Sequence, residues 1–146
     1  MSTEPTLFDR VSCVRSSDAA DLRAALRAAG FDVIELHGAD VDDKASLFRQ
    51  IAQDMPGRDD PPKRSWDALS DHVWQVVAAR RADSIAIVWS DAHVVLQSSL
   101  ATLLQFVGIV TDISRQAEVG EGGLPHATDL VLCLVGEGDA FDTFQQ

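Results

Sequence analysis

Three short runs of almost unbroken apolar residues constrain the fold of this chain most strongly. They occupy residues 31–36, 84–89 and 130–135, and longer segments with helical periodicity separate them. Strands of this kind are typical of a parallel sheet that is covered on both faces, because both sides of each strand must be hidden from water. The sequence therefore predicts an α/β fold, a three-stranded parallel sheet packed with helices. We expect six strand side chains to be buried: Val33, Ile34, Ile85, Ile87, Leu132 and Cys133.

The segments between these runs carry start and stop signals of helices. A first helix follows Asp18 and ends at Gly30, and a second begins at the acidic cluster of residues 40–43. The third helix is predicted to begin after Ser65, which is a good N-cap residue, and to end near residue 81. Its core-facing stripe is expected to consist of Trp66, Leu69, Val73 and Val76.

A chain of 146 residues has room for one compact domain. Residues 1–15 show little apolar patterning, so we expect an N-terminal extension that lies outside the core and can be removed without loss of the fold. Residues 16–140 are predicted to form the single domain, and residues 141–146 a polar C-terminal tail. The charged, doubly prolyl stretch of residues 57–64 is the clearest loop.

The charge of the chain restricts the partners that it can bind. Its 23 acidic and 12 basic residues give a net charge of −11, which repels nucleic acid and attracts a basic protein. Cys13 and Cys133 form neither a disulfide framework nor a metal-binding motif. The first residues do not resemble a signal peptide, and no apolar run is long enough to span a membrane. We therefore expect a cytoplasmic protein, monomeric and free of membrane contact.

No motif for catalysis or cofactor binding is present. The chain lacks a nucleophile elbow, a phosphate-binding glycine loop, a dinucleotide-binding motif and a zinc protease motif. Its four histidines are not spaced as metal ligands, and His72 is expected to be a solvated surface residue. We therefore predict a protein that is not an enzyme and that has no catalytic residues, no metal and no cofactor.

The most informative segment is the first half of the third predicted helix. When the core-facing stripe that begins with Trp66 is turned inward, the helical period places four other residues on another face: Asp67, Ser70, Asp71 and Trp74. Asp67 and Asp71 form a like-charge pair at positions i and i+4, which weakens an isolated helix by about 0.2–0.5 kcal/mol. Two interpretations stay open at this point. The face is either a solvated surface or an acidic patch, flanked by an aromatic ring, for a basic partner.

Three segments in a fixed order resemble the barstar family. They are Gly38-Ala-Asp-Val-Asp-Asp-Lys44, the helix that contains Ile51-Ala52, and Ser65-Trp-Asp-Ala-Leu-Ser-Asp71. Members of this family are intracellular inhibitors of secreted bacterial ribonucleases of the barnase type. The resemblance covers about residues 31–136 and implies a three-stranded parallel sheet packed with helices. It also implies an immunity-type role without chemistry of the chain's own.

The resemblance implies functions for individual side chains. Asp67 and Asp71 match two aspartates with which family members grip the phosphate-binding active site of a ribonuclease. Ser65 stands where the family has an asparagine, and Ser70 stands at a contact position. Asp112 aligns with a later family carboxylate on the last helix. Trp74, which the helical face adds, completes the predicted partner-binding set.

The chain also departs from the family pattern, and two other functions stay open. It contains no tyrosine, whereas family members place paired aromatic residues in the loop before the helix, and this loop carries Lys63 and Arg64 instead. The runner-up is therefore a barstar-fold interaction module for a different toxin or a regulatory protein. A third class, a small hydrolase that uses Asp67, Asp71 and His72, is opposed by the absence of a nucleophile or metal set.

Overall fold

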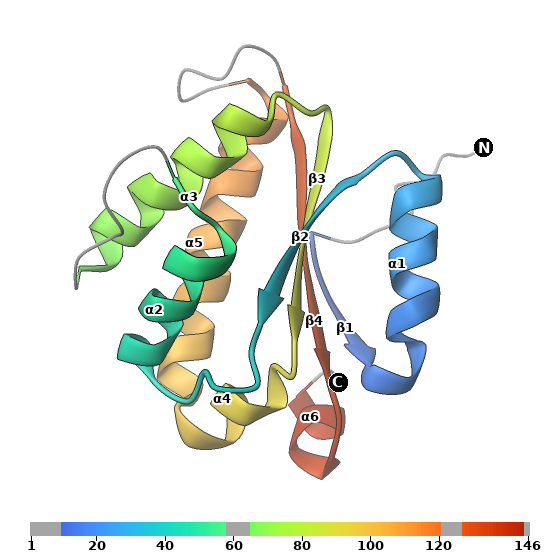
Figure 1. Cartoon of the computed structure of the whole chain (residues 1–146), viewed down its shortest axis with the longest axis vertical. Coiled ribbons are helices and arrows are strands. Elements are labelled where there is room, and N and C mark those ends of the chain that lie inside the picture. Colours follow the sequence, from blue (N-terminus) through green and yellow to red (C-terminus); the bar gives the residue numbers. More distant parts are fainter. Residues whose placement is uncertain (1–9, 58–64, 121–126, 145–146) are drawn as a thin grey trace.

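The computed structural model describes residues 10–57, 65–120 and 127–144 (Figure 1). Most of the predicted loop of residues 57–64, with Lys63 and Arg64, lies outside the described residues. In chain order the elements are β1 (Val11–Arg15), a 3-10 turn (Ser16–Asp18), α1 (Ala19–Ala28), β2 (Asp32–His37), α2 (Lys44–Asp54), α3 (Trp66–Arg80), β3 (Ser84–Ser90), α4 (His93–Ser98), α5 (Leu100–Glu118), β4 (Asp129–Gly136) and α6 (Asp139–Phe144).

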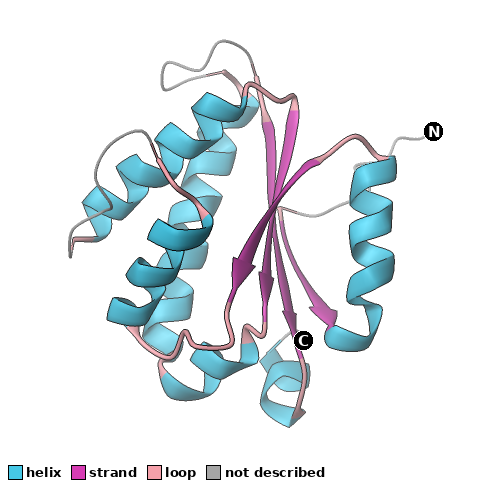
Figure 2. Ribbon diagram, viewed as in Figure 1, coloured by secondary structure: helices cyan, strands magenta, loops and turns pink. Residues whose placement is uncertain are grey.

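The strands of the described residues form one sheet in the order β1-β4-β3-β2, and every neighbouring pair is parallel. Figure 2 shows this sheet nearly edge-on, with helices on both sides. The predicted α/β class is confirmed, and β2, β3 and β4 coincide with the three apolar runs. The predicted number of three strands is wrong, because β1 adds a fourth strand beside β4.

The fourth strand lies inside residues 1–15, the segment expected to form an extension outside the core. Val11 is the register partner of Leu132, and the backbone N–H of Leu132 donates to the carbonyl of Arg10 at 2.9 Å. The guanidinium of Arg10 reaches α5, where it donates to the hydroxyl of Ser114 at 3.0 Å. Residues 10–15 are thus part of the folded domain.

One face of the sheet carries the larger core. Helices α2, α3 and α5 lie together on this side in Figure 1. Ile34, Ile85, Ile87 and Leu132 are buried here, as predicted. The ring of Trp89 meets the ring of Phe106 of α5 edge to face, with 5.3 Å between the centroids, a favoured aromatic geometry.

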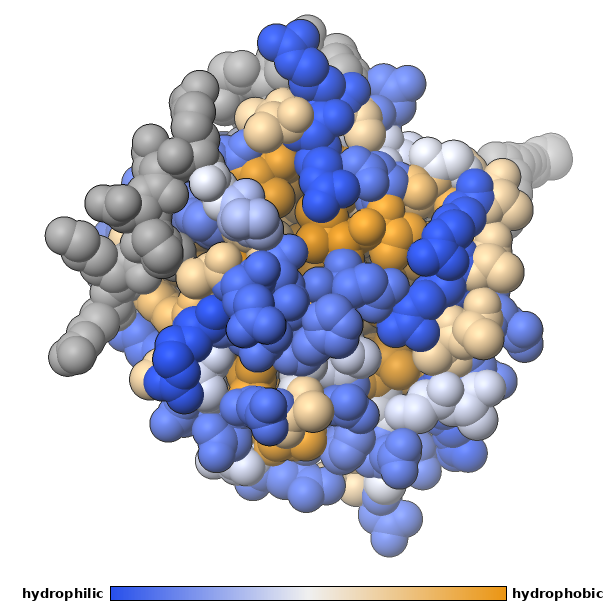
Figure 3. Space-filling model, viewed as in Figure 1, coloured by the Kyte–Doolittle hydropathy of each residue, from blue (hydrophilic) through white to orange (hydrophobic). Residues whose placement is uncertain are grey.

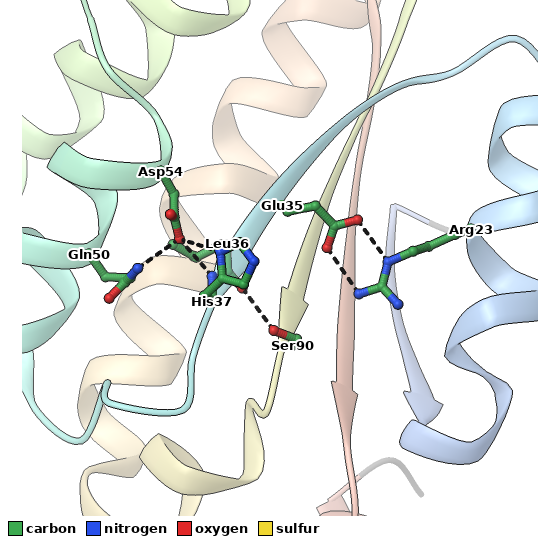
Figure 4. A network of polar contacts seen from close by, with 7 residues as sticks. All are labelled: Arg23, Glu35, Leu36, His37, Gln50, Asp54 and Ser90. Carbon is green, nitrogen blue, oxygen red and sulfur yellow. Dashed lines mark hydrogen bonds and ion pairs between the residues drawn. The ribbon is translucent and has the colours of Figure 1, made fainter.

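Among the described elements, α1 covers the other face (Figure 1). Leu26 of α1 is 0% exposed and packs in a second, smaller cluster. The strands contribute Ala86, Val88, Val131, Cys133 and Val135 to it. Cys133 is buried as predicted, whereas Val33 is only half-buried because β2 is an edge strand. Arg23 of α1 and Glu35 of β2 form a bidentate pair at 2.7 and 2.9 Å (Figure 4).

A hydrogen-bond network ties the end of β2 to the end of α2 on the opposite side of the strand (Figure 4). The carboxylate of Asp54 accepts from the backbone N–H of His37 at 2.7 Å and from the amide of Gln50 at 2.9 Å. Burial alone raises the pKa of Asp54, but these hydrogen bonds outweigh it and hold the pKa below its ordinary value. The end of β2 is therefore tied to the last turn of α2.

The C-terminal residues also belong to the domain. Residues 141–144, expected to begin a polar tail, lie in α6, and Phe141 is 1% exposed. The ring of Phe141 lies against the backbone of Gly136, where a Cβ atom would approach it to 2.7 Å. Glycine at the end of β4 therefore makes room for this ring.

Removal of residues 1–15 should lower the free energy of unfolding by about 3 kcal/mol or more. The deletion takes from β4 its hydrogen-bonded neighbour and exposes apolar side chains that cost about 1.5–3 kcal/mol each. Urea unfolding followed by tryptophan fluorescence measures the change. The control is Arg15→Ala, which removes an exposed ion pair with Asp142 and should cost less than about 1 kcal/mol. Equal stability of the deleted and full chains would contradict the assignment of β1 to the core.

Candidate partner-binding surface

The first turn of α3 is fixed by a cap and by an aromatic contact. The hydroxyl of Ser65, the predicted N-cap, accepts from the backbone N–H of Ala68 at 3.1 Å. Trp66 packs edge to face on Phe48 of α2, with 5.3 Å between ring centroids. The ammonium of Lys44 lies 5.3 Å from the Trp66 ring and 5.6 Å from the Phe48 ring. The start of α3 is therefore held against α2.

The two faces of α3 follow the predicted pattern. Leu69, Val73 and Val76 are buried, and Trp66 is partly buried against the same core. Asp67 and Asp71 are exposed, whereas Ser70 and Trp74 are half-buried. Asp67, Ser70 and Asp71 thus lie on the outward side of the helix, and Ser65 precedes them at the cap. Trp74, like Trp66, packs partly buried against the main core.

The two carboxylates on this face have no partner among the residues that the structure describes. Neither Asp67 nor Asp71 takes part in a hydrogen bond or an ion pair with any side chain of residues 10–57, 65–120 or 127–144. By contrast, Glu35 and Asp32 pair with Arg23 and with Arg80. The outward face of α3 therefore presents two negative charges, one helical turn apart, that a cationic molecule can neutralise.

His72 lies between these carboxylates and the core, and the expectation that it is a solvated surface residue is wrong. It is 4% exposed, and its ring Nε2 donates to the backbone carbonyl of Met55 at 2.7 Å. The ring also lies against Gly57, where a Cβ atom would come within 2.8 Å of Cε1. His72 therefore joins the turn after α2 to the middle of α3. Buried and engaged in this way, it is not available as a proton carrier for the hydrolase hypothesis.

Asp112 stands apart from the other predicted residues. It is exposed on α5 and pairs with Arg115 of the same helix. Helices α3 and α5 pack against each other, but Asp112 forms no hydrogen bond or ion pair with the described residues of α3. The structure therefore brings together the residues of α3 and leaves Asp112 on the neighbouring helix.

The described residues contain no group of three or more His, Cys, Asp or Glu side chains that could hold a metal ion. Burial raises the pKa of the Cys133 thiol above its ordinary value, which suits a core residue rather than a nucleophile. No helix in this part of the chain has the length and apolar character that a membrane span requires.

Comparison with known families bears on the same part of the chain. The family model described as Barstar (barnase inhibitor) matches residues 31–128, about two thirds of the sequence. The chain belongs to the barstar family. The match begins just before β2, includes all of α2, α3 and α5, and ends just before β4. Comparisons with curated proteins and with solved structures gave no match.

The barstar match leaves part of the domain outside it. The strands β1 and β4 and the helices α1 and α6 lie beyond residues 31–128. Helix α3, which carries the two exposed carboxylates, lies within the matched residues. The structural surroundings of α3, from the turn after α2 to α5, therefore come from the segment that defines the family.

The contact between His72 and Gly57 gives a test of how α3 is positioned. Gly57→Ala should lower the free energy of unfolding by about 1–3 kcal/mol, because the added methyl group displaces a buried, hydrogen-bonded ring. The control is Gly108→Ala in α5, where a Cβ atom meets nothing within 4 Å and alanine should stabilise the helix by about 0.5–1 kcal/mol. Urea unfolding measures both. A neutral Gly57→Ala would show that the His72 ring is not fixed.

Proposed function

We propose that this chain inhibits a basic ribonuclease of the barnase type by placing Asp67 and Asp71 in the active site of the enzyme. Membership of the family described as barnase inhibitors supports the inhibitory role. The observation that carries the proposal is the outward face of α3, which presents two exposed carboxylates without a cationic partner among the described residues. An intracellular inhibitor of this kind protects the cell that makes the enzyme.

The chemistry of the two partners explains how such an inhibitor acts. A ribonuclease binds the RNA phosphates with cationic side chains, and a carboxylate offers these cations the same charge and the same acceptor atoms. Four residues of helix separate Asp67 from Asp71, so their backbone positions differ by about 6 Å along the axis. Two charge-assisted contacts occupy the site without any bond being formed or broken, and RNA is excluded.

The neighbouring side chains complete the contact area. Ser70 and Trp74 lie beside the carboxylates, where a half-buried indole ring provides apolar area at low entropic cost. Ser65 acts indirectly, because its cap fixes the start of α3. Asp112 is proposed to contribute a further negative charge from α5 once Arg115 turns away from it.

The charge of the whole chain supports the same partner. A net charge of −11 attracts a cationic enzyme over several ångströms and raises the rate of association. Added salt screens this attraction, since the Debye length falls from about 10 Å at 0.1 M to about 3 Å at 1 M. Association is therefore expected to slow as the salt concentration rises.

A second candidate function is a barstar-fold interaction module for another toxin or a regulatory protein. The sequence supports this alternative, because the chain has no tyrosine for the paired aromatic contact that members of the family typically make. Such a module uses the same carboxylates against a different basic surface. Failure to reduce RNA cleavage by any barnase-type enzyme would favour this alternative.

Asp71→Ala should weaken binding to the inhibited ribonuclease by about 2–5 kcal/mol, more than any other single truncation on this face. The substitution leaves the enzyme's cations buried without a partner, which is the costly part of losing an interfacial charge. Titration calorimetry with the purified ribonuclease, together with an RNA cleavage assay, measures the loss.

The matched control for this prediction is Asp21→Ala. It removes the same charge from an exposed position on α1, on the opposite side of the sheet. Binding should change little, and both variants should unfold at nearly the wild-type urea concentration. Wild-type affinity of Asp71→Ala at matched salt would rule out the acidic-plug mechanism.

A further inference from the structure

A groove runs beside the second half of α3, next to the acidic face. It has a volume of about 600 Å³ and lies between the turn of residues 55–57 and the helix. Trp74, Gln75, Ala78 and Arg81 line it from the side of α3. Figure 3 shows apolar side chains at the surface in the upper middle of the view, bordered by hydrophilic side chains, at the level where β2 crosses the other strands in Figure 1.

The groove continues the face that carries the carboxylates. Asp67, Asp71, Gln75 and Ala78 follow one another at spacings of four, four and three residues, which places them in one line along a helix. The line is acidic in the first half of α3, and in the second half it becomes the wall of the groove. A protein that docks on Asp67 and Asp71 therefore extends naturally over the groove.

One side chain that lines the groove has a polar atom without a partner among the described residues. The side-chain oxygen of Gln75 is buried and accepts no hydrogen bond from the described residues. The other such atom in this part of the chain, the indole nitrogen of Trp89, belongs to the main core and does not line the groove. A buried amide oxygen without a partner is costly, and a donor from outside would relieve it once the Gln75 side chain turns toward the groove.

Arg81 stands at the end of the groove in an unusual backbone conformation. Its φ of 52° places it in the left-handed region, where a helix usually ends with glycine or asparagine. Its guanidinium is exposed and pairs with no acid of the described residues. Five other arginines in this part of the chain do pair with a carboxylate: Arg10, Arg15, Arg23, Arg80 and Arg115.

We propose that the groove receives a segment of the partner ribonuclease that bears a carboxylate, and that this carboxylate pairs with Arg81. This inference rests on the proposed function and specifies the partner further. Ten residues separate Asp71 from Arg81, which corresponds to about 15 Å along the helix. The partner thus carries a carboxylate about 15 Å from its cationic active site, on a segment that also donates a hydrogen bond to Gln75.

Charge reversal at Arg81 tests the proposal by the sign of its effect. The probe is the enzyme that the wild-type chain inhibits most tightly in a panel of purified barnase-type ribonucleases. Against a basic enzyme, an added negative charge strengthens binding unless the lost cation faced a carboxylate. Arg81→Glu should weaken binding about tenfold or more. The control Arg27→Glu makes the same change at the last turn of α1, where the arginine is also exposed and unpaired among the described residues, and should leave binding unchanged or tighter.

Two further variants separate binding from folding. Arg81→Gly suits the left-handed position, and Gln75→Met removes the unsatisfied amide while keeping the length of the side chain. Both should raise the urea midpoint of unfolding and yet weaken the complex, Arg81→Gly about tenfold and Gln75→Met about fivefold. A purely structural role for these residues would not combine greater stability with weaker binding.

Substitutions in the ribonuclease then identify the carboxylate that pairs with Arg81. Each exposed acid of the ribonuclease is changed to lysine, and one of these variants should regain affinity for Arg81→Glu. Unchanged or tighter binding by Arg81→Glu and Arg81→Gly, with Asp71→Ala still weakened, would overturn the groove proposal and leave the proposed function intact. If no enzyme of the panel binds the wild-type chain, the proposed function and the groove proposal fail together.

Discussion

Burial of the central strands on both faces is the constraint on which the rest of the structure depends. Every residue from Ile85 to Trp89 of β3 is 0% exposed. Such a strand must be covered on both sides, so the chain needs a layer of helices on each face of the sheet. Helix α1 provides one layer, and the other layer holds α3 with one face against the core and another toward the solvent. The candidate binding face is the side of α3 that this arrangement leaves exposed to solvent.

The same constraint explains which parts of the fold could be predicted from the sequence. Unbroken apolar runs are visible in the sequence because they are hidden on both faces, and β3 and β4 were found in this way. The edge strand β2 alternates between buried and half-buried residues, and it was found from its β-branched centre, Val33 and Ile34, between turn residues. An edge strand is paired on one side only. The residues of β1 include Ser12 and Arg15 among half-buried neighbours, so no local pattern distinguishes this strand from a loop. Its membership of the sheet depends on β4, which lies near the other end of the chain.

The candidate site was predictable to the extent that it is local. Helical periodicity alone separates Asp67 and Asp71 from the buried stripe, because all of these residues belong to one helix. The burial of His72 has a different origin, since the carbonyl that binds its ring lies 17 residues earlier in the chain. The left-handed conformation of Arg81 likewise has no sequence signal, because glycine is the residue that marks such a position. Contacts between elements decide both features, and periodicity reports only on one element at a time.

The pairing of β1 with β4 also bears on the order in which the chain can fold. Ser12 and Cys133, which face each other across these strands, lie 121 positions apart. During synthesis β1 therefore leaves the ribosome long before its only neighbour in the sheet exists. The sheet can close only after the 121 positions that separate them have been made, and contacts of such long range slow folding. Until then the nascent chain carries an unpaired β1 and an uncovered sheet edge, which can pair with strands of other chains.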